Sequence, residues 1–260
     1  MRITSTRSRR PKEWFDDDTF WRTMYPYMFP ERRFIAAQDE VDKLLALTQP
    51  ADKAVLDLAC GPGRCAIALA QRGHEVTGVD RTRYLLDKAR RKARAAGVKV
   101  RWLQQDMRDF VREQAFGLVI NMFTSFGYFD NKQEDILVLQ NIHASLKPGG
   151  WCLLEMISKE WLARHFLATS SHEMPDGTLF VERREVFDDW TRIRDEWTLI
   201  RDGRAQTFRF HHTIYSGQEL RDRLECVGFV DVAVYGDLDG APYDRKAKRL
   251  IIMGRRPRAQ

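Results

Sequence analysis

Short apolar runs separated by polar, glycine-rich turns divide most of the chain into alternating strands and helices. The run Ala54–Leu58 predicts a buried parallel strand, and apolar residues at helical spacing predict a helix over 64–72. The same alternation continues over 75–80, 84–96, 98–103, 116–120, 132–146 and 151–156, and ends with a helix over 216–227 and strands over 229–235 and 249–253. This pattern predicts an α/β fold with a doubly wound, mostly parallel seven-stranded sheet.

Residues 157–215 interrupt the alternation. A short helix is predicted over 160–166, and three strand-like stretches, 178–187, 190–200 and 205–215, follow it with polar turns between them. This spacing predicts a three-stranded antiparallel meander inserted into the α/β fold. We therefore divide the chain into an N-terminal part (1–34), a core (35–156), the insertion (157–215) and a C-terminal part of the core sheet (216–260).

The N-terminal part joins a basic stretch to a cluster of aromatic residues. We expect residues 1–12 to be disordered, whereas aromatic side chains recur throughout 14–34. Pro26 and Pro30 are expected to break this second stretch into short pieces. Two interpretations stay open: a helix pair that plugs a hydrophobic face of the domain, or an aromatic lid over a ligand site.

Composition and charge narrow the classes of function. The 260 residues carry a formal charge of +6, from 43 Lys and Arg against 37 Asp and Glu. Much of the excess lies at 2–12 and 255–258, which favours solvated tails over nucleic-acid-binding arms. The four cysteines show no metal-ligand spacing, so we expect no metal and a reducing cytoplasm. No run of about 18 apolar residues occurs, so we expect no membrane span.

A glycine turn directly after the first strand carries the main chemical signal. Gly61 and Gly63 allow φ > 0 and a close approach of backbone N–H groups to a ligand at the start of the next helix. The letters also fit the looser dinucleotide pattern, which leaves an NAD-dependent oxidoreductase as an alternative. Asp57, four residues before Gly61, would repel a pyrophosphate and suits a cationic ligand.

The stretch Asp57-Leu-Ala-Cys-Gly-Pro-Gly63 resembles motif I of the class I methyltransferases that use S-adenosylmethionine (SAM). Asp80 ends the second strand 17 residues after Gly63 (80 − 63), where a ribose-binding acid is expected. The resemblance places Asp106 and Met107 at the adenine, and the turn Leu146-Lys-Pro-Gly-Gly150 before the fifth strand strengthens it. It implies SAM as cofactor, held by Asp57, Ala59, Cys60, Gly61, Gly63, Asp80, Arg81, Asp106, Met107, Asn121 and Met122.

The loop 121–128 follows the fourth strand, so we expect it beside the transferred methyl group. It resembles the corresponding loop of small-molecule methyltransferases. It lacks both the Asn/Asp-Pro-Pro-aromatic tetrad and the Pro-Cys nucleophile of enzymes that methylate bases. We therefore expect methyl transfer to an oxygen or nitrogen of a small-molecule metabolite, with nucleic acid disfavoured as a partner. An RNA or protein methyltransferase and a SAM-binding protein without activity are the alternatives.

Three side chains are candidates for accepting a proton from the substrate: Tyr128, His211 and His212. The two histidines alternate across a predicted strand, so only one of them can face the site. The expected substrate-binding residues are Tyr25, Tyr27 and Phe29 of the lid, Phe126, Asp237 and Tyr243. We interpret the insertion as a cover over the substrate, and a homodimer surface is the alternative.

Overall fold

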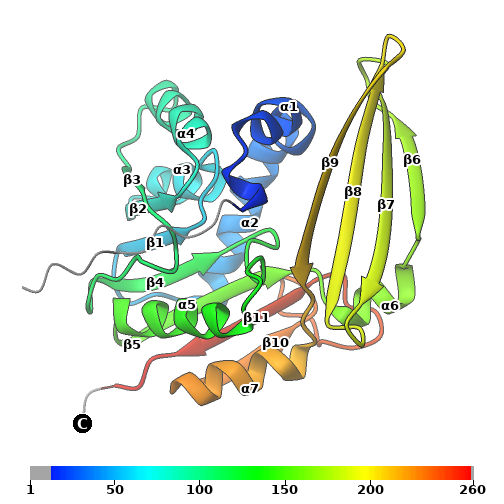
Figure 1. Cartoon of the computed structure of the whole chain (residues 1–260). Helices are drawn as coiled ribbons and strands as arrows, with labels where there is room; N and C mark the ends of the chain where they lie inside the picture. The colour runs from blue at the N-terminus through cyan, green and yellow to red at the C-terminus, as the bar shows by residue number, and fades with distance from the viewer. Residues whose placement is uncertain (1–12, 259–260) are drawn as a thin grey trace, which may run out of the picture.

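The structure is a computed structural model and describes residues 13–258; the basic stretch 2–12 lies outside the described residues. A seven-stranded sheet contains β1 (Ala54–Leu58), β2 (Glu75–Asp80), β3 (Arg101–Gln104), β4 (Phe116–Asn121), β5 (Leu146–Met156), β10 (Val230–Tyr235) and β11 (Leu250–Arg255). The strand order is β10-β11-β5-β4-β1-β2-β3, and β11 pairs antiparallel with both of its neighbours. The predicted doubly wound, mostly parallel sheet is confirmed (Figure 1).

Helices cover both faces of this sheet. They are α2 (Glu31–Thr48), α3 (Arg64–Gln71), α4 (Arg83–Ala95), α5 (Lys132–Ser145) and α7 (Gly217–Val227). The 3-10 turn η1 (Trp14–Asp16) is followed by α1 (Asp18–Met28), and both α1 and α6 (Lys159–His165) pack against strands of the insertion. Side chains of β1 alternate between two cores: Leu56 and Leu58 pack with α5 and α7, and Val55 packs with α2 and α3. Apolar residues on both faces explain why the central strands read as continuous hydrophobic runs.

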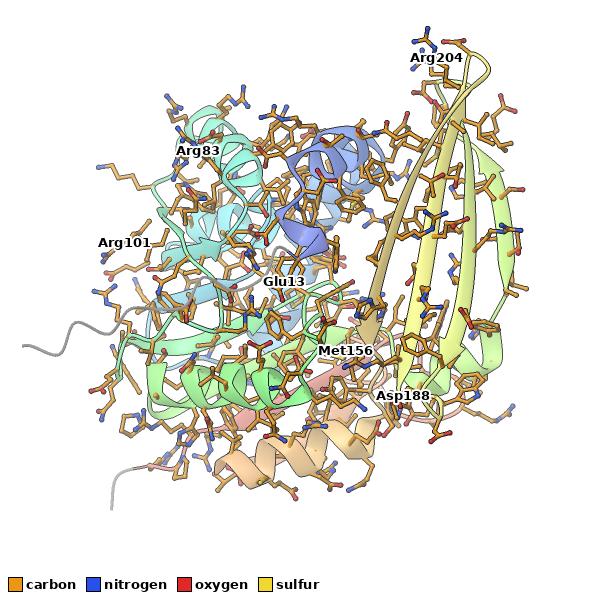
Figure 2. The ribbon with its side chains drawn as sticks, in the orientation of Figure 1. Glu13, Arg83, Arg101, Met156, Asp188 and Arg204 are labelled. Atoms are coloured by element: carbon orange, nitrogen blue, oxygen red, sulfur yellow. The ribbon has the colours of Figure 1, made fainter. Side chains whose placement is uncertain are left out.

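The insertion forms a second, antiparallel sheet of four strands rather than three. It consists of β6 (Thr169–Glu173), β7 (Leu179–Phe187), β8 (Arg192–Arg201) and β9 (Arg204–Thr213). Sequence reasoning missed β6 because this edge strand is polar and mostly exposed, so it shows no apolar alternation. Asp188 and Arg204 mark the two ends of the sheet (Figure 2), whose inner face packs against α1.

Several local expectations need correction. Pro26 does not break the aromatic stretch: it lies in the last turn of α1, and only Pro30 separates α1 from α2. Residues 146–150 belong to β5, with a bulge opposite Phe116 and Leu118.

Cys226 is exposed, whereas the other three cysteines are buried and all four are free thiols. Within residues 13–258, no helix is long and apolar enough to cross a membrane.

The basic C-terminal stretch is not simply solvated. Arg255 ends β11 and forms an ion pair with Asp231. Arg256 Nη1 donates to the carbonyl oxygens of His143, Ala144 and Leu146 at 3.0, 3.0 and 2.6 Å. These carbonyls end α5, where the helix leaves its acceptors unsatisfied, so Arg256 acts as a cap supplied from the other end of the chain.

We expect Arg256→Met to lower the free energy of unfolding by about 1–3 kcal/mol, because buried carbonyls lose a charged donor while the aliphatic stem is kept. Urea unfolding measures the change. Arg245→Met is the matched control, since Arg245 is exposed and has no hydrogen bond among the described residues. Equal stability of the two variants would contradict the capping role.

Candidate active site

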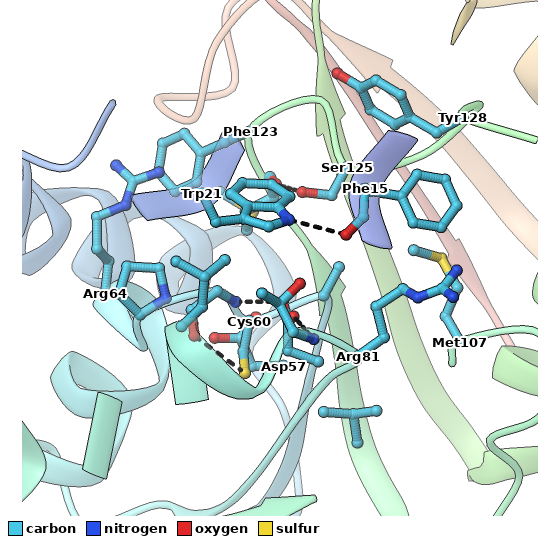
Figure 3. Close-up of a pocket in the computed structure, with 18 of the residues that line it drawn as sticks. Phe15, Trp21, Asp57, Cys60, Arg64, Arg81, Met107, Phe123, Ser125 and Tyr128 are labelled. Carbon is cyan, nitrogen blue, oxygen red and sulfur yellow. Dashed lines mark hydrogen bonds between the residues drawn. The ribbon is translucent and has the colours of Figure 1, made fainter. Parts of the chain in front are cut away.

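A cavity opens where the carboxyl ends of β1, β2 and β4 meet, the edge at which doubly wound sheets bind ligands. Its far wall comes from the N-terminal segment: Trp14 and Phe15 of η1, Trp21 of α1 and Phe29. Trp21 Nε1 donates to the Phe15 carbonyl at 2.9 Å and ties α1 to η1 beside the cavity (Figure 3). The chain therefore encloses this edge of the sheet with its own aromatic side chains.

The turn between β1 and α3 forms the floor of the cavity. Ala59, Gly61 and Gly63 adopt φ values of 58°, 53° and 82°, a region that glycine enters at little cost. A Cβ on Gly61 would meet only the ring of Phe29, at 4.0 Å, whereas a Cβ on Gly63 would lie 2.6 Å from the Trp102 side chain. Gly61 thus keeps the backbone open to the cavity. Gly63 does not line the cavity and is required by packing.

Asp57 brings to this floor a carboxylate with one unpartnered oxygen. It is 3% exposed, and its Oδ2 atom has no hydrogen-bond partner among the described residues. Burial raises the pKa of Asp57 to about 7, against the opposing effects of the Ala66 N–H and the Arg64 guanidinium. An ionised carboxylate buried without a partner is costly, so a cationic ligand group would be stabilised here.

Asp80 connects the second strand to the glycine turn. Its Oδ2 accepts from the Gly61 N–H at 2.8 Å and its Oδ1 accepts from the Thr82 N–H at 2.7 Å. Burial raises the pKa of Asp80, and these two donors oppose the shift. Each carboxylate oxygen has a further lone pair. Asp80 can therefore hold the turn and still accept hydrogen bonds from a diol in the cavity.

Asp106 and Met107 line the end of the cavity beside β3, but Asp106 already has cationic partners. Its Oδ2 accepts from Arg108 Nη2 at 2.7 Å and lies 3.1 Å from Arg81 Nη1. Burial acts to raise the pKa of Asp106, but the Arg108 guanidinium outweighs it and the pKa is lowered. Arg108 also donates to Glu13 at 2.5 and 3.0 Å. Ion pairs thus attach the N-terminal segment to this end of the cavity.

Two arginines at the opposite end were not foreseen from the sequence. Arg33 of α2 and Arg64 of α3 line the cavity, and neither guanidinium forms a hydrogen bond or an ion pair with another described residue, although the charge of Glu40 acts on both. Arg64 is only 7% exposed and lies 3.5 Å from the centre of the Phe123 ring. Burial lowers the pKa of both guanidiniums. The position of Arg64, directly after Gly63, was the one available signal for this anion-binding corner.

The loop after β4 supplies the remaining wall. Met122, Phe123 and Ser125 line the cavity. Asn121 does not: its Nδ2 donates to the Leu58 carbonyl at 3.0 Å and links β4 to β1. Its Oδ1 atom is buried without a partner among the described residues, and its expected role at the cofactor stays a prediction. Ala59, Cys60, Asp80 and Arg81 of the expected set do line the cavity.

The structure separates the three candidate proton acceptors. Tyr128 lines the cavity, and its burial raises its pKa. His212 lies behind it, with the two ring centres 4.9 Å apart. Burial lowers the pKa of His212 to about 4, so the ring is neutral at pH 7. His211 does not line the cavity and forms a 2.6 Å contact with Asp130.

Of the lid residues expected to bind substrate, only Phe29 lines the cavity. Tyr25 lies against Tyr84 of α4, with 5.8 Å between ring centres. The Tyr27 hydroxyl contacts Asp176 at 3.0 Å, before β7. Both tyrosines are drawn away because α1 lies between α4 and the four-stranded sheet, and its aromatic side chains hold it to each.

The remaining expected substrate residues have structural contacts outside the cavity. Phe126 is 1% exposed and packs against Tyr215. Asp237 accepts from the Asp239 and Ala241 N–H groups and so shapes its own turn. The Tyr243 hydroxyl forms hydrogen bonds with Ser158 and Glu160 at 2.7 and 2.8 Å. Phe126, Asp237 and Tyr243 therefore do not line the cavity. Within residues 13–258, no three His, Cys, Asp or Glu side chains gather as a metal-ligand set.

Comparison with known proteins identifies the family. A model of the methyltransferase domain matches residues 55–150. A cypemycin N-terminal methyltransferase from a Streptomyces species is 34% identical over 203 residues, which span 77% of this chain and 82% of the relative. The chain belongs to the class I SAM-dependent methyltransferases.

Two further comparisons define the extent of the similarity. YqeM of Bacillus subtilis is 30% identical over 156 residues, so the chain spans only 60% of that relative. A crystal structure of a SAM-dependent methyltransferase from Clostridium acetobutylicum covers 92% of this methyltransferase and 98% of its own chain, with a TM-score of 0.74 and 16% identity. The family assignment sets aside the NAD-dependent oxidoreductase alternative.

The cavity fits SAM, which is both cationic and zwitterionic. The Asp57 carboxylate, with its unpartnered oxygen, suits the sulfonium and ammonium groups, and Asp80 suits the ribose diol. Arg33 and Arg64 form a corner suited to the methionine carboxylate. Acidic and basic groups therefore lie at different places in one cavity, as a zwitterion requires.

We expect Asp57→Asn to weaken SAM binding by about tenfold at pH 8, because a charge-assisted contact to a cation is lost. Affinity of the unmodified protein should fall between pH 8 and pH 6, since protonation with a pKa of about 7 removes the Asp57 charge. The variant should lack this dependence. Calorimetric titration measures both, with Asp202→Asn, at the β8–β9 turn, as control. A variant that keeps the pH dependence would contradict the role of Asp57.

Asp80→Ala should weaken SAM binding by about 2 kcal/mol, since the ribose loses a charged acceptor and the Gly61 N–H loses its partner. Asp80→Asn keeps one oxygen and should lose less. The same titration compares the three proteins. An unchanged affinity in Asp80→Ala would rule out the ribose assignment.

Proposed function

We propose that this methyltransferase moves the methyl group of SAM to an oxygen or nitrogen of a small molecule. The observation that carries the proposal is the aromatic wall formed by Trp14, Phe15 and Trp21, which closes the cavity on the side away from the sheet. A wall made by the chain itself leaves room for a small acceptor and excludes a folded macromolecule. The N-terminal segment then acts as a lid, and the four-stranded insertion as a cover over the acceptor.

Binding and alignment account for most of the catalysis in this proposal. When bound, SAM supplies an electrophilic methyl group and a neutral thioether as leaving group. The residues of the chain hold the acceptor in line and exclude water. Tyr128 is the one candidate of the three that lines the cavity; a raised pKa makes it a hydrogen-bonding group rather than a base. A proton lost by the acceptor would then leave through solvent.

A second candidate function is methylation of a peptide N terminus. The relative of highest coverage named above is an N-terminal methyltransferase, and the chain spans 82% of it. A flexible peptide end could reach the cavity where a folded protein could not. The three buried free thiols fit a reducing cytoplasm for either acceptor.

Incubation of the protein with methyl-labelled SAM and a metabolite extract, followed by separation of products by size, tests the proposal. We expect the label in the small-molecule fraction and none with Asp57→Asn. Label that appears only in a protease-sensitive or nuclease-sensitive fraction would contradict the small-molecule acceptor. A protease-sensitive label on an α-amino group would support the second candidate.

A further inference from the structure

A band of polar side chains crosses the inner face of the four-stranded sheet between two apolar clusters. Phe180, Leu199 and Phe210 pack against α1 on one side of the band, and Ile193 packs with Leu162 of α6 on the other. The band itself contains Ser170, Glu182, Arg184, Asp195 and His212, which come from all four strands. Register places Arg184 and Phe210 on either side of Asp195. Polar groups buried between two apolar clusters call for a functional explanation, because apolar residues would be buried there at lower cost.

Asp195 lacks a close partner within this band. Its side chain is 8% exposed and forms no hydrogen bond with any residue in 13–258. Arg184 Nε lies 3.7 Å from Asp195 Oδ1, which is longer than a hydrogen bond. The other donors of Arg184 are taken by Glu182 at 2.5 Å and by Ser170 at 3.0 Å. Once Asp195 is ionised, above its pKa of about 7, two carboxylates against one guanidinium give the band a net charge of −1.

His212 offers a second unused acceptor beside Asp195. Its Nδ1 atom is buried without a partner and lies 3.8 Å from Asp195 Oδ2. Burial lowers the pKa of His212 to about 4, so the neutral ring can present Nδ1 as a lone pair when Nε2 carries the proton. Two acceptors at this separation can both be bonded by one nitrogen that has two or more N–H groups. A hydroxyl has only one hydrogen to donate and cannot satisfy both.

This pair lies directly behind the wall of the SAM cavity. The ring of His212 contacts that of Tyr128, which lines the cavity. Trp14, also in the wall, stacks on Phe210 with 4.8 Å between ring centres. Asp195 and His212 do not line the cavity themselves, so an acceptor in the cavity meets them only when the ring of Tyr128 or Trp14 turns aside.

We propose that Asp195 and His212 Nδ1 bind a protonated amine on the methyl acceptor. This inference rests on the proposed function and narrows its substrate class to molecules with an ammonium group. An ammonium held in this way has no lone pair, so it anchors the acceptor and the methyl group goes to a different oxygen or nitrogen. Arg184 lies beside the Asp195 carboxylate and orients it through charge. Glu182 and Ser170 in turn hold the Arg184 guanidinium in place.

A purely structural role for Asp195 makes a different prediction for its neutral variant. Burial raises the pKa of Asp195 to about 7 in the folded protein without ligand. The free energy of unfolding therefore falls as the pH rises from about 4 to 7, because Asp195 ionises more readily in the unfolded chain. The groups that face it are Arg184 and Glu182 of β7, His212 of β9 and Tyr128 of the loop after β4. Asp195→Asn should therefore leave the melting temperature at pH 8 unchanged or higher, whereas loss of a structural ion pair would lower it.

Tyramine and 4-ethylphenol are suitable probes, since they differ only by the ammonium group. We would measure the affinity of each by NMR for the protein saturated with S-adenosylhomocysteine. We expect tyramine to bind about tenfold to a hundredfold more tightly than 4-ethylphenol, the value of a charged hydrogen-bonded contact. Asp195→Asn should remove this preference. Glu196→Gln, the next residue on the outer face, where it pairs with Arg209, should keep it.

Equal affinities of the unmodified protein for the two probes would overturn the proposal. Absence of tyramine binding at millimolar concentrations would overturn it as well. A preference that survives in Asp195→Asn would also overturn it. Methyl transfer is scored separately in the same samples with labelled SAM. Tyramine that binds through Asp195 while label enters only macromolecules would leave the ammonium site in place and refute the small-molecule function.

Discussion

The hydrogen bond from the Gly61 N–H to Asp80 is the contact on which the site depends. It joins the turn after β1 to the end of β2 at 2.8 Å, while the Cys60 N–H donates to the Val79 carbonyl at 3.0 Å beside it. These two bonds hold in one conformation a backbone with positive φ values at the alternate residues Ala59, Gly61 and Gly63. Without them the turn would not present its N–H groups and the Asp57 carboxylate to the same space.

The parts of this site that sequence could predict are those fixed by the local chain. Asp57 and Gly61 are joined by three residues, so a strand followed by a glycine turn places both at the sheet edge. Asp80 follows from the right-handed β1–α3–β2 crossover, which brings the ends of the two strands together. For Gly63 the positive φ was predicted, but the close contact with Trp102 was not, because Trp102 comes from a strand much further along the chain.

The sequence placed some residues incorrectly because their positions depend on which neighbouring element each side chain contacts. Aromatic residues surround α1 on all sides because the helix lies between α4 and the four-stranded sheet, and helical spacing does not say which side faces the cavity. Tyr25 and Tyr27 were therefore expected at the cavity, which is lined instead by Trp21 of α1 and by Trp14 of η1. Partners far apart in sequence, such as Arg256 with the end of α5, leave no periodic signal.

Electrostatics links the N-terminal segment to the end of the cavity beside β3. Arg108 has a 1% exposed side chain and must find anionic partners; Glu13 of the N-terminal segment, Asp106 of the cavity and Glu134 of α5 share it. A ligand that donates a hydrogen bond to Asp106 would bind to the same carboxylate as Arg108. Because Glu13 and Glu134 both lie beside it, the Arg108 guanidinium keeps anionic partners whichever groups occupy Asp106. One buried arginine therefore joins the N-terminal segment, the cavity wall and α5.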